Sequence, residues 1–162
     1  MKVYHGSLNL VAKPEIREPQ RTLDYGKGFY TTTSYQQAYD WVLRHKKDKE
    51  HPQKGFVCIY EVDIDTIRKS NCLWFDGPSE EWVDFVHANR AKKDFVHNYD
   101  FVYGPVANDK VYAAFTLYED GLLNKQELIR ELKTYTLVDQ LLFHTEEALS
   151  HLKFVEAKEI KL

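Results

Sequence analysis

The sequence has few cysteines, no excess of basic residues and no long apolar run. Cys58 and Cys72 stand in different segments and form neither a CxxC pair nor a Cys/His ligand spacing, so we expect free thiols in a reducing compartment. The formal net charge of −3 argues against a strongly basic nucleic-acid surface. No run approaches the ~20 apolar residues that span a bilayer, and the first residues lack the apolar stretch of a signal peptide. The sequence therefore predicts a cytoplasmic protein without a membrane partner.

Two classes of catalytic motif are also missing. The seven histidines form no HExxH motif and no pair four residues apart, so we expect no metal. No GxSxG elbow is present, which gives no support to a Ser/His/Asp hydrolase. The basic stretches 44–54 and 89–94 are hints of a nucleic-acid anchor, but the simpler interpretation is a solvated helix end and loop.

The composition that remains is that of a folded protein rich in aromatic residues. The 162 residues are 43% apolar and 14% aromatic, with 11 Tyr and 9 Phe. This length predicts one domain over 1–162 with a single core. So many tyrosines also suit a concave site that stacks a flat ligand.

Strand and helix signals alternate along the chain and predict a mixed α+β fold. Strands are predicted at 2–5, 29–32, 55–65, 100–107, 110–118, 139–145 and 152–160. Helices are predicted at 35–45, 79–90, 124–133 and 146–152, with N-caps at Ser34, Ser79 and Thr145 and an apolar stripe of Ala38, Trp41 and Val42 on the first. Residues 11–25 are predicted to form a loop, and Asn108-Asp109 a tight turn between two strands.

The segment GKGFYTTT (26–33) has two interpretations. Gly26 and Gly28 could serve a hairpin or bulge that places Tyr30 in the core. Alternatively, the glycines let the backbone approach a ligand closely while the Tyr30 ring stacks on it. The glycines alone do not decide between the two.

Combined with the first strand, this segment resembles a known superfamily. YHGS (4–7), then G-x-G-Φ-Y-T-T, then a helix with A-x-x-W resemble the nicotinamide-binding half of the ADP-ribosyltransferases, in the poly(ADP-ribose) polymerase and diphtheria-toxin-like branch. The chain is also similar, through EEWVDFVHANR, DFVYGPVAND and QLLFHTEEALSHLKF, to a bacterial family of unknown function, family 3990. The resemblance implies an ADP-ribosyltransferase-like split mixed β-sheet with flanking helices.

The resemblance also implies roles for individual residues toward NAD. His5 would bind ribose hydroxyls, the Gly6 backbone would bind the nicotinamide carboxamide, and Ser7 would add a further hydrogen bond. Tyr30, with Gly28 before it, would cover one face of the nicotinamide ring. Trp41 would cover the other face, with Tyr39 as a substitute.

The loop arginines and the third catalytic position complete the implied site. Arg17 and Arg21 could reach the pyrophosphate, because guanidinium groups suit its geometry. Superfamily members place a glutamate on a later strand, where this chain presents Gln140. Asp109 is the rival carboxylate and Glu146 a more distant one.

The function that follows is NAD-dependent ADP-ribosyl transfer. The resemblance implies NAD as the substrate, a protein or a nucleic acid as the acceptor and, as one setting, a bacterial toxin with an antitoxin partner. Two alternatives stay open: a catalytically degenerate NAD-binding or interaction module, and an NAD glycohydrolase that transfers ADP-ribose to water.

Overall fold

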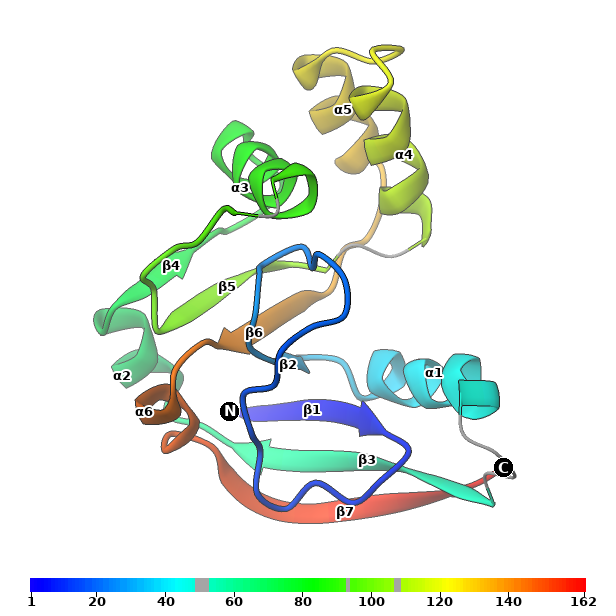
Figure 1. The fold of residues 1–162 in the computed structure, drawn as a ribbon, viewed down its shortest axis with the longest axis vertical. Coiled ribbons are helices and arrows are strands. Elements are labelled where there is room, and N and C mark those ends of the chain that lie inside the picture. Colours follow the sequence, from blue (N-terminus) through cyan, green and yellow to red (C-terminus); the bar gives the residue numbers. More distant parts are fainter. Residues whose placement is uncertain (49–52, 93, 107–108) are drawn as a thin grey trace.

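A mixed seven-stranded sheet forms the centre of the structure (Figure 1). The structure is a computed structural model that describes residues 1–48, 53–92, 94–106 and 109–162. Over these residues the strand order is β4-β5-β6-β2-β1-β3-β7, and β4–β5 is the parallel pair. The strands are β1 (Lys2–Ser7), β2 (Phe29–Thr32), β3 (Lys54–Glu61), β4 (Cys72–Trp74), β5 (Phe101–Pro105), β6 (Asp139–Phe143) and β7 (Lys153–Lys161). The predicted α+β class is confirmed.

The helices follow their capping signals. They are α1 (Tyr35–His45), α2 (Ile64–Lys69), α3 (Glu80–Ala91), α4 (Asp109–Glu119), α5 (Lys125–Leu132) and α6 (Glu146–Leu149), with a 3₁₀ turn, η1 (Lys46–Asp48). The predicted N-caps Ser34, Ser79 and Thr145 each accept a hydrogen bond from a backbone N–H of the first turn, which satisfies a donor that the helix leaves unpaired. Within the described ranges, none of these helices has the length and apolar character needed to cross a bilayer.

The prediction of a strand at 110–118 is wrong, because this segment is helix α4. Its aromatic and β-branched residues favour a strand by composition. However, Val111, Ala114 and Phe115 are the buried residues, and their spacing is that of one helical face. The predicted turn before it falls partly on Asn108, which lies outside the described residues, while Asp109 begins α4. The sequence also gave no prediction of α2 or β4.

Strand alternation divides the core between two faces of the sheet. Face A, defined here as the side of Tyr30 and Leu142, carries two apolar clusters, one under α1 and one under α3, α4 and α5 (Figure 1). Face B, the side of Phe29 and Phe143, carries one cluster that includes residues of α2 and α6. On face A the polar residues Thr32 and Gln140, paired across β2 and β6, lie in the sheet between the strands of the two clusters.

The loop between β1 and β2 packs on both faces. Val11 and Ile16 contact the face B cluster, and the Tyr60 hydroxyl donates a hydrogen bond to the Val11 carbonyl at 2.5 Å. Tyr25, further along the same loop, is fully buried in the face A cluster. The loop therefore changes faces just before it enters β2, and this brings its second half over face A.

Candidate active site

His5 and Tyr30 meet between the two central strands. His5 Nδ1 lies 2.8 Å from the Tyr30 carbonyl oxygen, and because a carbonyl only accepts, Nδ1 carries the proton. Burial lowers the pKa of His5, with a smaller contribution from Arg17 that also lowers it, so the ring is neutral at pH 7. Nε2 is then the nitrogen with a lone pair, which is able to accept a hydrogen bond from a hydroxyl.

β1 and β2 separate next to this contact. Over the described residues their register consists of one pair, Tyr4 with Thr32. Backbone groups of successive strand residues point to opposite neighbours. The Tyr30 carbonyl reaches β1, so the backbone of Thr32 also faces β1, and the backbones of Tyr4 and Gly6 face β2. Gly6 thus directs its N–H and C=O toward β2, at a point where the hydrogen-bonded ladder between β1 and β2 has ended. The Tyr30 carbonyl of β2 is instead hydrogen-bonded to the His5 ring.

Gly6 also has a packing reason to be glycine. A Cβ at this position would lie 2.3 Å from the carbonyl oxygen of Ala38 and 3.3 Å from a methyl group of Val42. Helix α1 therefore rests directly on the β1 backbone, and a larger residue would push the helix away. This explains Gly6 without a ligand.

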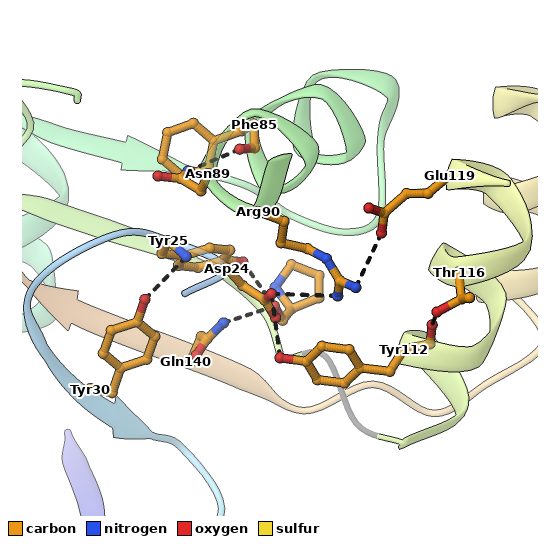
Figure 2. Close-up of polar contacts among 11 residues, drawn as sticks. Asp24, Tyr25, Tyr30, Phe85, Asn89, Arg90, Tyr112, Thr116, Glu119 and Gln140 are labelled. Atoms are coloured by element: carbon orange, nitrogen blue, oxygen red, sulfur yellow. Dashed lines mark hydrogen bonds and ion pairs between the residues drawn. The ribbon is translucent and has the colours of Figure 1, made fainter. Parts of the chain in front are cut away.

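The side chain of Tyr30 is fixed at its phenol end. Its hydroxyl donates to the Gly26 carbonyl at 2.7 Å. It also accepts from the Tyr25 N–H at 3.1 Å (Figure 2). Gly26 has φ +84°, a left-handed conformation that favours glycine. Gly28 is constrained by packing, since a Cβ there would lie 2.7 Å from the Phe143 carbonyl oxygen. The turn therefore holds Tyr30 in a single orientation.

Two histidines bind carbonyl groups of the same turn. His144 Nδ1 lies 2.7 Å from the Lys27 carbonyl oxygen and His97 Nε2 lies 3.0 Å from that of Tyr25. The rings meet edge to face at 4.4 Å. Burial lowers the pKa of His97 and lowers that of His144 to about 4. Both are neutral at pH 7 and donate one proton each to the turn.

Gln140 is buried on face A, with 7% of its surface exposed. It pairs with Thr32 on β2 and Gly104 on β5, and its Nε2 donates to the Pro105 carbonyl oxygen at 3.3 Å. Tyr25 donates its hydroxyl to the same carbonyl at 2.8 Å. With Nε2 engaged by a carbonyl, Oε1 is the atom of Gln140 suited to accept a hydrogen bond.

A buried ionic cluster, which the sequence did not reveal, lies beside these residues (Figure 2). Asp24, 8% exposed, faces Arg90 of α3 at 3.7 Å and accepts a 3.5 Å hydrogen bond from the Tyr112 hydroxyl. Arg90 also pairs with Glu119 of α4 at 3.1 Å and stacks on the Tyr112 ring. The Arg90 side chain is only 16% exposed, so it is not part of a solvated helix end as the sequence suggested. An Asp before Tyr-Gly in a loop is typical of an ordinary turn, so no sequence pattern pointed to Asp24.

The other predicted site residues lie around this centre. Arg17 is exposed and pairs with Glu15 at 3.4 Å, and Arg21 lies close enough to lower the pKa of Asp24. The hydroxyl of Ser7 accepts a hydrogen bond from the Asn9 N–H at 3.1 Å.

Trp41 is not part of the buried stripe of α1 that the sequence predicted. It is 37% exposed and stacks on His45 with ring centroids 4.1 Å apart. Tyr39 is half-buried against the cluster under α1. Trp41 therefore stacks on His45 and not on a ring beside Tyr30.

The rival carboxylates belong to other elements than Gln140. Asp109 is the first residue of α4, and its side chain lies outside what the structure describes. Glu146 is exposed at the start of α6, beyond the opposite end of β6. Among the described residues no three His, Cys, Asp or Glu side chains gather as a metal site would require.

The comparisons with known proteins identify a family. A family model described as "Protein of unknown function (DUF3990)" matches residues 1–154. No curated protein and no solved structure matches the chain.

Proposed function

The chain belongs to this family of unknown function, DUF3990, and we propose that it is an NAD-dependent ADP-ribosyltransferase. The proposal combines the resemblance of YHGS and GKGFYTT to the nicotinamide-binding half of that superfamily with the geometry of the β1–β2 edge. It includes the finer fold assignment, an ADP-ribosyltransferase-like split sheet.

One observation carries the proposal: β1 and β2 separate at Gly6 and Tyr30. A primary carboxamide offers one donor and one acceptor side by side, and Gly6 directs the complementary pair of backbone groups into this edge. The neutral His5 ring donates Nδ1 to the Tyr30 carbonyl and packs on Phe29, on face B, with ring centroids 4.4 Å apart. We assign its remaining acceptor, Nε2, to a ribose hydroxyl. The Tyr30 ring, fixed at its phenol end, supplies an aromatic surface for the nicotinamide.

The reaction follows from positioning rather than from a covalent intermediate. The bond between the nicotinamide nitrogen and the ribose C1′ breaks, and its electron pair leaves with neutral nicotinamide. Positive charge develops on the ribose, and a lone pair of the acceptor then attacks C1′ while the acceptor proton passes to solvent. The residues of this chain orient NAD and stabilise the developing charge.

Gln140 is the proposed third residue of the site. Its Oε1 would accept a hydrogen bond from the ribose 2′-hydroxyl while Nε2 stays on Pro105. A glutamine brings a dipole where the superfamily usually has a full charge. Electrostatic stabilisation of this kind is worth roughly 3 kcal/mol in enzymes, so the source of negative charge decides how fast the reaction runs.

The partners stay predictions. The acceptor is a protein or a nucleic acid, and an antitoxin protein would bind this chain if it is the toxin of a bacterial pair. Arg17 and Arg21 are the proposed pyrophosphate ligands, because both lie in the loop between β1 and β2, where Arg17 lowers the pKa of His5 and Arg21 lowers that of Asp24.

A transfer assay with NAD labelled in the adenylate half tests the proposal. Tyr30→Ala should weaken NAD binding about fivefold or more through loss of ring stacking, and Gln140→Ala should slow nicotinamide release ~10- to 100-fold. Gln36→Ala, on the exposed side of α1, is the matched control and should behave as the wild type. Undiminished transfer by both site variants would exclude this site.

The second candidate, a binding module without catalysis, is favoured by one observation, the glutamine at position 140. Calorimetry separates the two, because a module binds NAD and releases no nicotinamide. Release of free ADP-ribose without a labelled macromolecule would instead indicate an NAD glycohydrolase.

A further inference from the structure

We propose that Asp24 is the anionic group of the site and supplies the negative charge that Gln140 lacks. The inference rests on the proposed function, because it assigns a role in the same reaction. It also answers a question that the sequence left open, namely which carboxylate serves a site whose third position is an amide.

The position of Asp24 is the first argument. Asp24 directly precedes Tyr25, whose backbone N–H holds the Tyr30 hydroxyl and whose own hydroxyl shares the Pro105 carbonyl with Gln140. Figure 2 shows Asp24 between Tyr30 and Gln140 on one side and Arg90 and Tyr112 on the other. Asp24 is therefore the chain neighbour of the residue, Tyr25, that contacts Tyr30 directly and shares a hydrogen-bond acceptor with Gln140.

The charge balance is the second argument. Asp24 and Glu119 share the single guanidinium of Arg90, so the three side chains carry one net negative charge when ionised. Arg90 Nη1 is buried and has no hydrogen-bond partner among the described residues, which is consistent with a loose 3.7 Å approach to Asp24. Arg21 acts on Asp24 less strongly than Arg90 does and offsets this negative excess in part. A buried negative excess that remains is unfavourable by itself. The positive charge that develops on the ribose as nicotinamide leaves would compensate it.

Access is the third argument. Tyr112, which donates to Asp24, is 40% exposed, so the cluster reaches the surface between α4 and the β1–β2 loop. Burial raises the pKa of Asp24, while Arg90, the Tyr112 hydroxyl and Arg21 lower it and Glu119 raises it. Because Asp24 acts only when ionised, nicotinamide release should increase with pH as the carboxyl group loses its proton.

The proposed step leaves Asp24 chemically unchanged. As the bond from C1′ to the nicotinamide nitrogen breaks, its electron pair leaves with nicotinamide and the ribose becomes positively charged. The Asp24 carboxylate stabilises that charge without taking a proton. The acceptor then forms the new bond to C1′ and releases its proton to solvent.

The test moves the carboxylate from one residue to the other. Asp24→Asn should slow nicotinamide release at saturating NAD by ~100-fold, change the affinity for NAD by less than about threefold, and abolish the rise of the rate with pH. The variant that combines Asp24→Asn with Gln140→Glu should release nicotinamide at least tenfold faster than Asp24→Asn alone. A purely structural role of Asp24 predicts no such rescue.

Two controls separate charge from folding. Asp84→Asn removes a carboxylate from an exposed 2.7 Å ion pair with Lys125 on the same side of the molecule and should leave release unchanged. If Asp24→Asn alone does not fold, Asp24→Asn with Arg90→Gln removes both charges of the pair, and the same rescue is expected from Gln140→Glu.

The results have distinct readings. If the wild type releases nicotinamide and folded Asp24→Asn releases it at the same rate, the inference is wrong and the proposed function stands. The same holds if Gln140→Glu does not restore nicotinamide release in Asp24→Asn. Absence of any release from the wild type overturns the proposed function, and the inference with it.

Discussion

At the scale of single residues, the site depends on how a few polar groups are paired. The resemblance of YHGS and GKGFYTT to a known superfamily predicted His5, Gly6 and Tyr30 together, and the structure brings them to one edge through the His5–Tyr30 hydrogen bond. The sequence could not predict the contact between Asp24 and Arg90, because the two residues are far apart in the chain and neither belongs to a spaced motif. Long-range ionic contacts of this kind depend on the packing of α3 against the loop, which local patterns do not encode.

Gly6 gives a prediction at this scale. Gly6→Ala places a methyl group 2.3 Å from the Ala38 carbonyl oxygen, so α1 must shift and the free energy of unfolding should fall by about 1–3 kcal/mol. Urea denaturation measures the change. Gly77→Ala is the matched control, because nothing lies within 4 Å of a Cβ there. Equal stability of the two variants would contradict the close packing of α1 on β1.

At the scale of elements, the turn 26–28 shows what holds the ring of Tyr30. His97 and His144 come from the segment after α3 and from the end of β6. His144 donates to the Lys27 carbonyl of the turn, and His97 donates to the carbonyl of Tyr25, just before it. The sequence predicted the turn from its glycines. It did not predict these clamps, and it assigned α4 to a strand because aromatic and β-branched residues dominate there, although the burial of Val111, Ala114 and Phe115 follows a helical period.

The clamps predict a pH dependence of stability. The pKa of His144 is about 4 in the folded chain and 6.5 is its ordinary value, so the unfolded chain binds a proton first as the pH falls. The contribution of His144 to the free energy of unfolding is therefore fully present above pH 6.5. It is lost between about pH 6.5 and 4, by at most about 1.4 kcal/mol per pH unit. His97 and His5, whose pKa values are also lowered, act in the same direction.

Urea denaturation at a series of pH values measures this effect. His144→Asn keeps a donor near the Nδ1 position and removes the titrating ring, so it should flatten the dependence. His45→Asn, on the exposed end of α1, is the control. A wild-type stability that is constant from pH 7 to 4 would contradict burial of these neutral rings.

At the scale of the whole molecule, face A of the sheet is covered by two groups of helices, α1 alone and α3 with α4 and α5. The cluster under α1 belongs to β1, β3 and β7, and the cluster under α3, α4 and α5 belongs to β4, β5 and β6. The strand pair at the junction, β1 with β2, is held by a single register pair. A ligand at that edge would touch both groups, through Gly6 on one side and Tyr30 on the other.

The central claim is that this edge binds NAD, and an NMR titration of ¹⁵N-labelled protein with NAD tests it most directly. The account predicts that the Gly6 and Tyr30 amide signals move most, because the carboxamide meets the Gly6 backbone and the ring meets Tyr30. Nicotinamide alone should move the Gly6 signal as well, and the amide of Gly121, in the loop between α4 and α5, should stay in place. Unchanged Gly6 and Tyr30 signals at saturating NAD would contradict the account.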